Sequence, residues 1–159
     1  MLTQRGYTNI SIVDQEIIAT KQTGQNIVLF LETIQQFNVG KYQEYVSAAE
    51  KRNVKHIIVI TNKITPNIEN MIRVSVNMDI KIETFYECEL QYNITKHELV
   101  PLHTLLSRVE SESMKEKYKA SSFPVILKTD AISRFYNYSS GFIVKINRKN
   151  GDIAFRIVK

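Results

Sequence analysis

Apolar runs and amphipathic segments alternate along the first half of the chain. Two short runs of β-branched and apolar residues, 16–21 and 26–31, are separated by Gln22–Gln25, a spacing typical of a β-hairpin with a four-residue loop. Between Lys41 and Asn53 apolar residues recur every three or four positions, which predicts an amphipathic helix. The segment 54–61 is mostly apolar and β-branched, so we expect a buried strand there.

A second helix and a further strand follow this buried strand. Thr65 can cap a helix and Pro66 suits the first helical position, so the pair predicts a helix extending to about Val76. Another strand is expected from Ile80 to Tyr86. This order of elements predicts a small α/β sandwich in the first half.

The second half contains a capping box. Ser107 and Glu110 are spaced so that each side chain can accept a hydrogen bond from the other residue's backbone N–H. We therefore expect a helix from Arg108 to about Lys119, with Met114 and Tyr118 on its buried side.

A hairpin is predicted at the end of the chain. Asn150–Gly151 lies between the apolar segments 142–146 and 153–158, and Asn-Gly is the preferred pair for a two-residue type I′ turn because both positions need positive φ. Counted from this turn, Ile146 faces Phe155, and Lys145 faces Arg156.

Like charges directly opposite each other on two paired strands destabilise a hairpin by roughly a few tenths of a kcal/mol or more. We predict that Lys145 and Arg156 approach a carboxylate, either Asp130 or one on another protein. The alternative is that both side chains extend into water.

Length and composition fit an ordinary globular protein. The chain has 159 residues and 43% hydrophobic residues, enough for one domain or two small ones. Cys88 is the only cysteine, which excludes an intrachain disulfide and suits a reducing compartment. The longest apolar run, Ile27–Leu31, is far shorter than the roughly 20 residues of a membrane helix. We expect a soluble intracellular protein without a secretory signal.

Charge is distributed unevenly. Residues 1–90 contain nine Lys and Arg against ten Asp and Glu, a net charge of −1, whereas residues 91–159 contain twelve against six, a net charge of +6. The excess of positive charge therefore lies entirely in the second half.

Common catalytic motifs are absent from the sequence. His97-Glu98 is not the start of a zinc-protease HExxH motif, because position 101 is Pro. Cys88 lies between two glutamates, which disfavours a thiolate, and no phosphate-binding glycine loop occurs. His56 lies in the buried strand and is interpreted as a paired core histidine.

A metal-dependent nuclease site is a further alternative, because such sites use carboxylates on adjacent strands together with a lysine. The first hairpin carries Glu16, Lys21 and Glu32, but no Glu-x-Lys sequence. An active nuclease is therefore disfavoured.

The segment Asn93–His103 (NITKHELVPLH) closely resembles the NIT-x-HELVP-x-H signature of the fifth-largest common subunit of nuclear RNA polymerases, a family that has relatives among the archaeal RNA polymerase subunits. Further matches follow in family order along nearly the whole chain: Arg5-Gly6-Tyr7, Val54–Thr61, Thr65-Pro66, Tyr118-Lys119, Pro124, Asp130, Arg134, Gly141, Val144–Ile146 and Phe155-Arg156. Departures, including Val125 in place of Arg and a short final hairpin, indicate a diverged copy such as one from a large DNA virus.

The resemblance implies an α/β protein of two domains. Residues 1–90 are expected to form a small nuclease-like α/β jaw domain without catalysis, and residues 91–159 a compact α+β assembly domain with a C-terminal β-hairpin. It also implies a non-catalytic polymerase subunit without cofactor or metal, which docks on the largest subunit and lines the downstream DNA channel. Thr65, Pro66 and Asn67 are then expected near DNA. The partner-subunit interface is expected to comprise His97, Glu98, Leu99, Val100, Pro101, His103, Pro124, Asp130, Arg134, Gly141, Lys145 and Arg156.

The charge of the expected jaw limits its contact with DNA. Because affinity for DNA comes largely from neutralised phosphates, we expect residues 1–90 alone not to bind duplex DNA measurably. A free-standing nucleic-acid-binding module that uses residues 91–159 is the alternative function, ahead of a nuclease. The expected location is the nucleus for a cellular protein, and a cytoplasmic viral factory or the virion for a viral one.

Overall fold

Two separate β-sheets organise the chain, each with its own core. The computed structural model describes residues 1–13, 16–33, 36–74 and 79–159, without the side chains of residues 73 and 74. Its contacts divide the chain into an N-terminal unit, Leu2–Tyr92, and a C-terminal unit, Asn93–Lys159, which Met1 joins. The predicted boundary at residue 90 lies two residues before this division.

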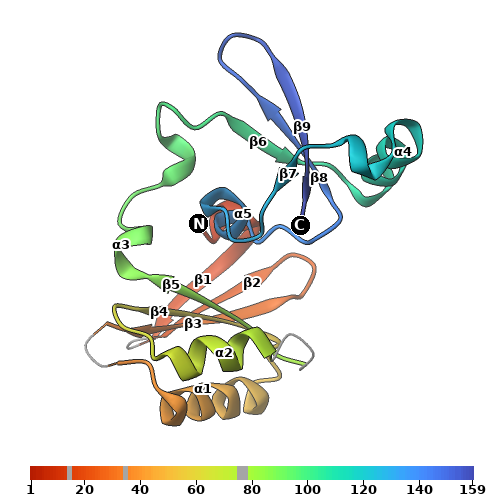
Figure 1. Cartoon of the computed structure of the whole chain (residues 1–159). Coiled ribbons are helices and arrows are strands. Elements are labelled where there is room, and N and C mark those ends of the chain that lie inside the picture. Colours follow the sequence, from red (N-terminus) through yellow and green to blue (C-terminus); the bar gives the residue numbers. More distant parts are fainter. Residues whose placement is uncertain (14–15, 34–35, 75–78) are drawn as a thin grey trace. The chain divides into compact units, whose positions relative to one another are not determined.

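The N-terminal unit is built on a mixed five-stranded sheet in the order β1-β2-β3-β4-β5 (Figure 1). Strands β1 to β3 pair antiparallel, and β3, β4 and β5 pair parallel. The strands are β1 (Tyr7–Val13), β2 (Glu16–Lys21), β3 (Asn26–Glu32), β4 (His56–Thr61) and β5 (Lys81–Tyr86). The helical elements are η1 (Thr3–Arg5), α1 (Val39–Lys51), α2 (Pro66–Val74) and α3 (Glu87–Leu90).

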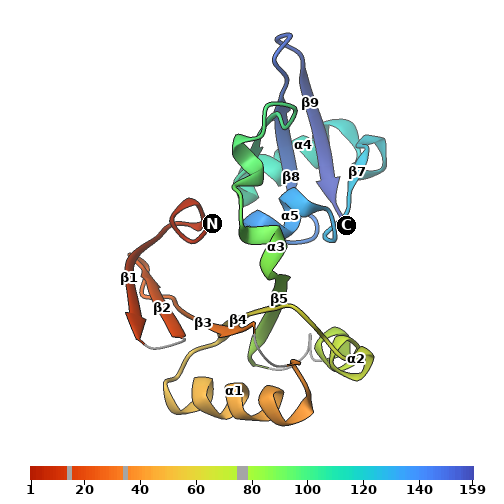
Figure 2. The ribbon, with the colours of Figure 1, turned by 90° about the vertical axis from the view of Figure 1, so that its left-hand side faces the viewer.

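Helices α1 and α2 cover the same face of this sheet (Figures 1 and 2). The α1 stripe of Tyr42, Tyr45 and Ala49 is buried there against β3 and β4, as its periodicity predicts. The Asn38 side chain begins the helix by accepting a hydrogen bond from the Lys41 N–H. Sequence and structure therefore agree on α1, on the hairpin of β2 and β3, and on the buried strand β4.

Some predicted bounds differ from the structure. Strand β5 begins at Lys81, one residue after the prediction, and the predicted end of α2 at Val76 lies outside the described residues. Strand β1 is absent from the elements expected from the sequence; it has no continuous apolar run, and its side chains beyond Tyr7 are exposed. Pairing with β2 stabilises this segment as a strand.

Residues of the motif Arg5-Gly6-Tyr7 connect the start of the chain to the N-terminal sheet by an ion pair and by burial of a side chain. Arg5 ends η1, and its guanidinium contacts both carboxylate oxygens of Glu83 on β5, at 3.3 and 2.9 Å. His56 Nε2 on β4 contacts the same carboxylate at 2.5 Å. Gly6 has φ of +85°, which favours glycine, and Tyr7 is buried. His56 is thus a paired histidine, as predicted.

The C-terminal unit contains a four-stranded sheet in the order β6-β8-β9-β7. Its strands are β6 (Leu102–Leu105), β7 (Val125–Ile126), β8 (Ile143–Asn147) and β9 (Ile153–Val158). Its helical elements are η3 (Ile94–Lys96), α4 (Arg108–Tyr118), η4 (Ala120–Ser122) and α5 (Ala131–Tyr136). The core packs Val144, Ile146 and Val158 of the sheet against α5 and against residues 94 and 100.

Helix α4 begins with the predicted capping box but buries a different residue. The Ser107 hydroxyl accepts from the Glu110 N–H, and the Glu110 carboxylate accepts from the Ser107 N–H. These hydrogen bonds lower the pKa of Glu110. Tyr118 is 49% exposed and contacts the edge of the Phe123 ring, so its predicted burial is wrong; Ser111 is the buried residue of this helix.

The β8–β9 hairpin forms at the predicted place with a different turn and register. Arg148 N–H donates to Asp152 O at 2.8 Å and Gly151 N–H to Arg148 O at 3.1 Å, which leaves a three-residue loop with φ of +89° at Gly151. This pattern is typical of a three-residue hairpin loop, and it does not require positive φ at Asn150. The predicted two-residue type I′ turn is therefore wrong.

The three-residue loop shifts every cross-strand pair by one position. Ile146 pairs with Ala154, Lys145 with Phe155, and Val144 with Arg156. Lys145 and Arg156 therefore lie on opposite faces of the sheet, and the predicted pairing of like charges is wrong. Apolar residues occur at both odd and even positions of the two strands, so the hydrophobic pattern alone does not distinguish the registers.

The β2–β3 hairpin forms at the predicted place, but its loop has three residues, 22–24, like that of β8–β9, so the predicted four-residue loop is wrong. Lys21 N–H donates to Gln25 O at 2.9 Å, Gly24 N–H donates to Lys21 O at 2.9 Å, and φ of Gly24 is +81°.

Among the described residues, no helix is both long enough and apolar enough to span a bilayer.

Candidate subunit interface

The segment Asn93–His103 begins the C-terminal unit and runs from η3 into the first residues of β6. His97, Glu98 and Leu99 are exposed, and the Leu99 side chain is 84% accessible. His97 Nδ1 accepts a hydrogen bond from the Leu99 N–H at 3.2 Å, which holds the turn between them. The side chains of this turn are therefore available to a partner.

The end of the same segment is tied into the sheet. Val100 packs on the core beside α5, and His103 Nδ1 contacts the Pro101 carbonyl oxygen at 2.8 Å. His103 itself pairs with Ile146 across the β6–β8 ladder. Glu98 forms an exposed ion pair of 3.5 Å with Lys149 of the β8–β9 loop.

Several other predicted interface residues have structural roles. The Pro124 carbonyl accepts from the Ile157 N–H, which aligns β7 beside β9. Asp130 caps α5 by accepting from the Ile132 N–H at 2.9 Å. Gly141 has φ of +85° and donates to the Val158 carbonyl. Arg134 is half-buried in α5.

The predicted approach of Lys145 and Arg156 to Asp130 is not seen. Asp130 is used as a helix cap, and the Arg156 guanidinium lies 3.5 Å from the Val125 carbonyl oxygen. Within the described ranges, neither cation forms an ion pair with a carboxylate.

The expected DNA-proximal residues lie at the start of α2. The Thr65 carbonyl accepts from the Ile68 and Glu69 N–H groups, while Pro66 and Asn67 are exposed. Glu69 places a negative charge in the first turn of this helix. Pro66 and Asn67 are therefore accessible to a ligand. The negative charge of Glu69 offsets the attraction of the helix N-terminus for a phosphate group.

The residues considered for a nuclease are engaged with other side chains. Glu16 binds Arg52 with a separation of 2.5 Å, and buried Glu32 accepts from the Tyr45 hydroxyl at 2.5 Å. Burial, with this hydrogen bond, raises the pKa of Tyr45. In the described part of the chain, no group of three or more His, Cys, Asp or Glu residues is arranged to hold a metal ion.

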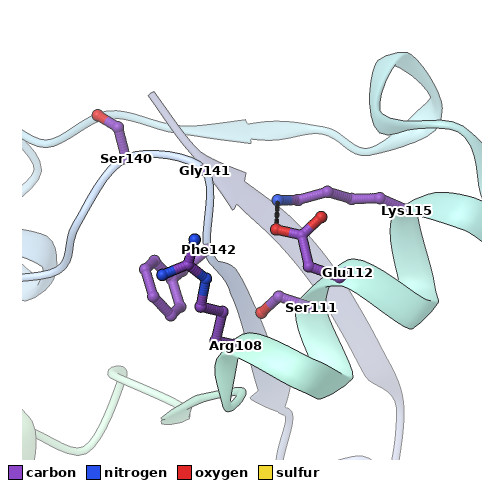
Figure 3. A pocket seen from close by; sticks show the side chains of 7 residues that line it. All are labelled: Arg108, Ser111, Glu112, Lys115, Ser140, Gly141 and Phe142. Atoms are coloured by element: carbon purple, nitrogen blue, oxygen red, sulfur yellow. Dashed lines mark hydrogen bonds and ion pairs between the residues drawn. The ribbon is translucent and has the colours of Figure 1, made fainter.

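A cavity of about 300 Å³ lies between α4 and the start of β8 (Figure 3). Its polar groups are largely paired with each other or with the backbone: Lys115 binds Glu112 at 3.1 Å, and the Ser111 hydroxyl accepts from the Ile143 N–H. The lining residues are Arg108, Ser111, Glu112, Lys115, Ser140, Gly141 and Phe142. The Ser111 hydroxyl and the Lys115 ammonium group are therefore both engaged in structural contacts.

Sequence reasoning missed the face of the C-terminal sheet that carries Leu102 of β6 and Ile153 of β9, which both pair with Asn147. Leu102 and Ile153 lie on this face and are 63% and 54% exposed. The signal in the sequence is Ile153 and Phe155, two apolar residues two positions apart on one strand, where a solvated strand face normally has polar residues.

The comparisons with known proteins extend over the whole chain. A family model described as "RNA polymerase Rpb5, C-terminal domain" matches residues 92–158. A protein of Invertebrate iridescent virus 6 named "Putative DNA-directed RNA polymerase subunit 454R" is 30% identical over all of this chain and 94% of its own length.

The cellular relatives match over smaller parts of this chain, and of their own lengths, than the viral protein does. The Dictyostelium discoideum "DNA-directed RNA polymerases I, II, and III subunit rpabc1" is 35% identical over 77% of this chain and 64% of its own length. The Arabidopsis thaliana "DNA-directed RNA polymerase V subunit 5A" is 33% identical over 64% of this chain, and the match spans 47% of the plant protein. The viral match covers the full chain, and the family model covers the C-terminal unit. This chain therefore belongs to the Rpb5 family of DNA-directed RNA polymerase subunits.

Proposed function

We propose that this chain is a non-catalytic subunit that docks on the largest subunit of its RNA polymerase through the C-terminal unit. The full-length match to a viral polymerase subunit carries the proposal, and the family model covers this unit. His97, Glu98 and Leu99 are exposed in the segment that begins this unit, where they can contact a partner. The net charge of +6 in residues 91–159 favours an acidic partner surface.

We further propose that the N-terminal unit is the jaw beside downstream duplex DNA. Thr65, Pro66 and Asn67 at the start of α2 are the residues proposed to face the phosphate backbone. Residues 1–90 have a net charge of −1, and Glu69 lies in the first turn of α2, so this contact is weak by itself. It depends on placement of the unit by the larger subunits.

The location follows from the polymerase in which the chain assembles. A cellular copy would act in the nucleus, and a viral copy in a cytoplasmic factory or in the virion. The similarity to an iridescent virus protein over the full chain supports a viral copy.

Affinity purification of the tagged chain from its native source tests this function. The two largest polymerase subunits are expected to co-purify with the tagged chain and to remain bound after nuclease treatment, which removes associations mediated by nucleic acid. Recovery of the chain alone, or only together with nucleic acid, would contradict the proposal.

A further inference from the structure

The cavity between α4 and the start of β8 has a wall of hydrogen-bond donors on its helix side (Figure 3). Arg108, Ser111 and Lys115 line it from α4, and their spacings of three and four residues place them on one side of a helix. Figure 3 shows the Arg108 and Lys115 side chains extending from α4 toward the segment 140–142. The Lys115 ammonium group lies 3.9 Å from the position that a Cβ atom would take on Gly141. This cation therefore lies between the helix and that segment.

Ser111 is the buried donor of this wall. Its side chain is almost fully buried, with 1% of the residue exposed, and its oxygen accepts from the Ile143 N–H at 3.2 Å. A hydroxyl group also has a proton to donate, and in the part of the chain that the structure describes this proton has no acceptor. Because a buried donor without an acceptor is unfavourable, the Ser111 hydroxyl indicates that the cavity receives an oxygen atom of a ligand.

Arg108 is the unpaired cation of the cavity. It is the first residue of α4 and is exposed. Across the described ranges its guanidinium forms neither an ion pair nor a hydrogen bond. A guanidinium presents a planar set of N–H donors that can bind one oxyanion through two parallel hydrogen bonds. Arg108 is therefore available to an anion that enters the cavity.

Lys115 is paired, but with a carboxylate that water can also reach. Its Nζ lies 3.1 Å from Glu112 Oε1, and the two side chains are 20% and 59% exposed. An ion pair in contact with solvent contributes little stability. An anion in the cavity can therefore replace Glu112 at the ammonium group, while the glutamate side chain turns into water.

The number of donors distinguishes between classes of anion. A carboxylate has two oxygen atoms, whereas a phosphomonoester has three terminal oxygen atoms that accept hydrogen bonds strongly. The guanidinium, hydroxyl and ammonium groups belong to three separate side chains, which match three oxygen atoms better than two. The cavity volume of about 300 Å³ is small for a ligand site, and Phe142 adds an apolar wall. This space suits a phosphate group with a small organic part.

We propose that this cavity binds the phosphate group of a small phosphomonoester through Arg108, Ser111 and Lys115. The phosphate accepts the free proton of the Ser111 hydroxyl and displaces Glu112 from Lys115. The bound group connects α4 with the segment before β8, and so it stabilises the folded C-terminal unit. This site goes beyond the role of a polymerase subunit and does not depend on it.

The test is a titration of the isotope-labelled full chain by nuclear magnetic resonance at constant ionic strength. Inorganic phosphate and glycerol phosphate are the probes, and acetate and glycerol are the comparison solutes. Both phosphate compounds are expected to shift the amide signals of residues 108–115 and 140–143 saturably. A Kd of about 1 mM is expected, on the order given by two charge-assisted hydrogen bonds. Acetate is expected to bind at least about tenfold more weakly, because it lacks the third oxygen atom.

Substitutions on α4 assign the binding to this cavity. Arg108→Gln and Lys115→Met are each expected to weaken phosphate binding about tenfold. Glu112→Gln is expected to strengthen it about threefold, because the competing carboxylate is removed. Lys117→Gln is the matched control, since Lys117 is exposed on the same helix and does not line the cavity. It removes one positive charge, as Arg108→Gln does, and is expected to bind like the wild type.

Thermal unfolding of each variant establishes that it is folded. The inference is overturned if neither phosphate compound gives saturable shifts, or if Lys117→Gln weakens binding as much as Arg108→Gln. Weaker binding in Glu112→Gln would show that the carboxylate supports the site, against the proposed competition. Acetate binding as tight as phosphate binding would assign the cavity to carboxylates, and binding of inorganic phosphate without glycerol phosphate would exclude phosphomonoesters. Because the free chain is titrated, none of these results bears on the proposed function.

Discussion

Replacing Glu83 by Gln removes the charge that joins the start of the chain to the N-terminal sheet. The Glu83 side chain is 13% exposed and lies between the Arg5 guanidinium, at 2.9 Å, and His56 Nε2, at 2.5 Å. Burial by itself would raise the pKa of Glu83. The hydrogen bond from His56 and the charge of Arg5 outweigh burial and hold this pKa at about 2, against an ordinary 4.5.

The difference in pKa sets the size and sign of the effect. At about 1.4 kcal/mol per pKa unit, the shift corresponds to about 3 kcal/mol of stability. Because the pKa is lower in the folded state, this contribution is complete above the ordinary pKa of 4.5 and is lost as the pH falls toward 2. By about pH 3, about 2 kcal/mol is lost, which is about thirtyfold in the equilibrium between folded and open forms.

Amide hydrogen exchange of the full chain measures this effect locally. Protection of the β4 and β5 amides, corrected for the intrinsic exchange rate, is expected to decrease about thirtyfold between neutral pH and about pH 3 in the wild type. Glu83→Gln is expected to lower protection at neutral pH and to remove most of this pH dependence. Glu44→Gln is the control, because Glu44 forms an exposed ion pair with Lys41. Equal pH dependence in the wild type and in Glu83→Gln would refute the reasoning.

Two further substitutions test single hydrogen bonds. Ser107→Ala removes the cap of α4 and is expected to lower the stability of the C-terminal unit by about 1 kcal/mol, seen as lower amide protection in α4; unchanged protection would show that the capping box is dispensable. Tyr45→Phe keeps the ring stacked on Phe30 but removes the hydrogen bond to buried Glu32, and is expected to cost about 1–3 kcal/mol in urea unfolding. Tyr42→Phe is the matched control for the second substitution, and an equal effect of the two would contradict the role of the Glu32 bond.

The local elements of this protein follow closely from its sequence. The spacing of Tyr42, Tyr45 and Ala49 predicts α1, and the apolar run before Thr61 predicts β4, because burial of one face or of a whole strand leaves a period in the sequence. Ser107 and Glu110 predict the start of α4 because capping depends only on neighbouring residues. The NITKHELVPLH segment likewise indicates the family, since a long string of matches is specific without a structure.

Other features depend on tertiary contacts. Strand β1 exists through its pairing with β2, and the exposed side chains of its outer half carry no burial signal. The Arg5–Glu83–His56 cluster joins residues that are far apart in the sequence, so only the sheet brings their charges together. No local pattern specifies such a contact.

The β8–β9 hairpin shows which features follow from local sequence and which depend on tertiary packing. Asn150–Gly151 fixes where the chain turns, because the backbone there needs a residue that tolerates positive φ. The register is decided by core packing of Val144, Ile146 and Val158 and by the loop hydrogen bonds of Arg148 and Asp152. A shift of one residue moves every side chain to the opposite face, and both faces of these strands have apolar residues in the sequence. The sequence alone therefore determined that Lys145 lies in a hairpin, and the tertiary structure decided that it pairs with Thr104 and Phe155, on the opposite face of the sheet from Arg156.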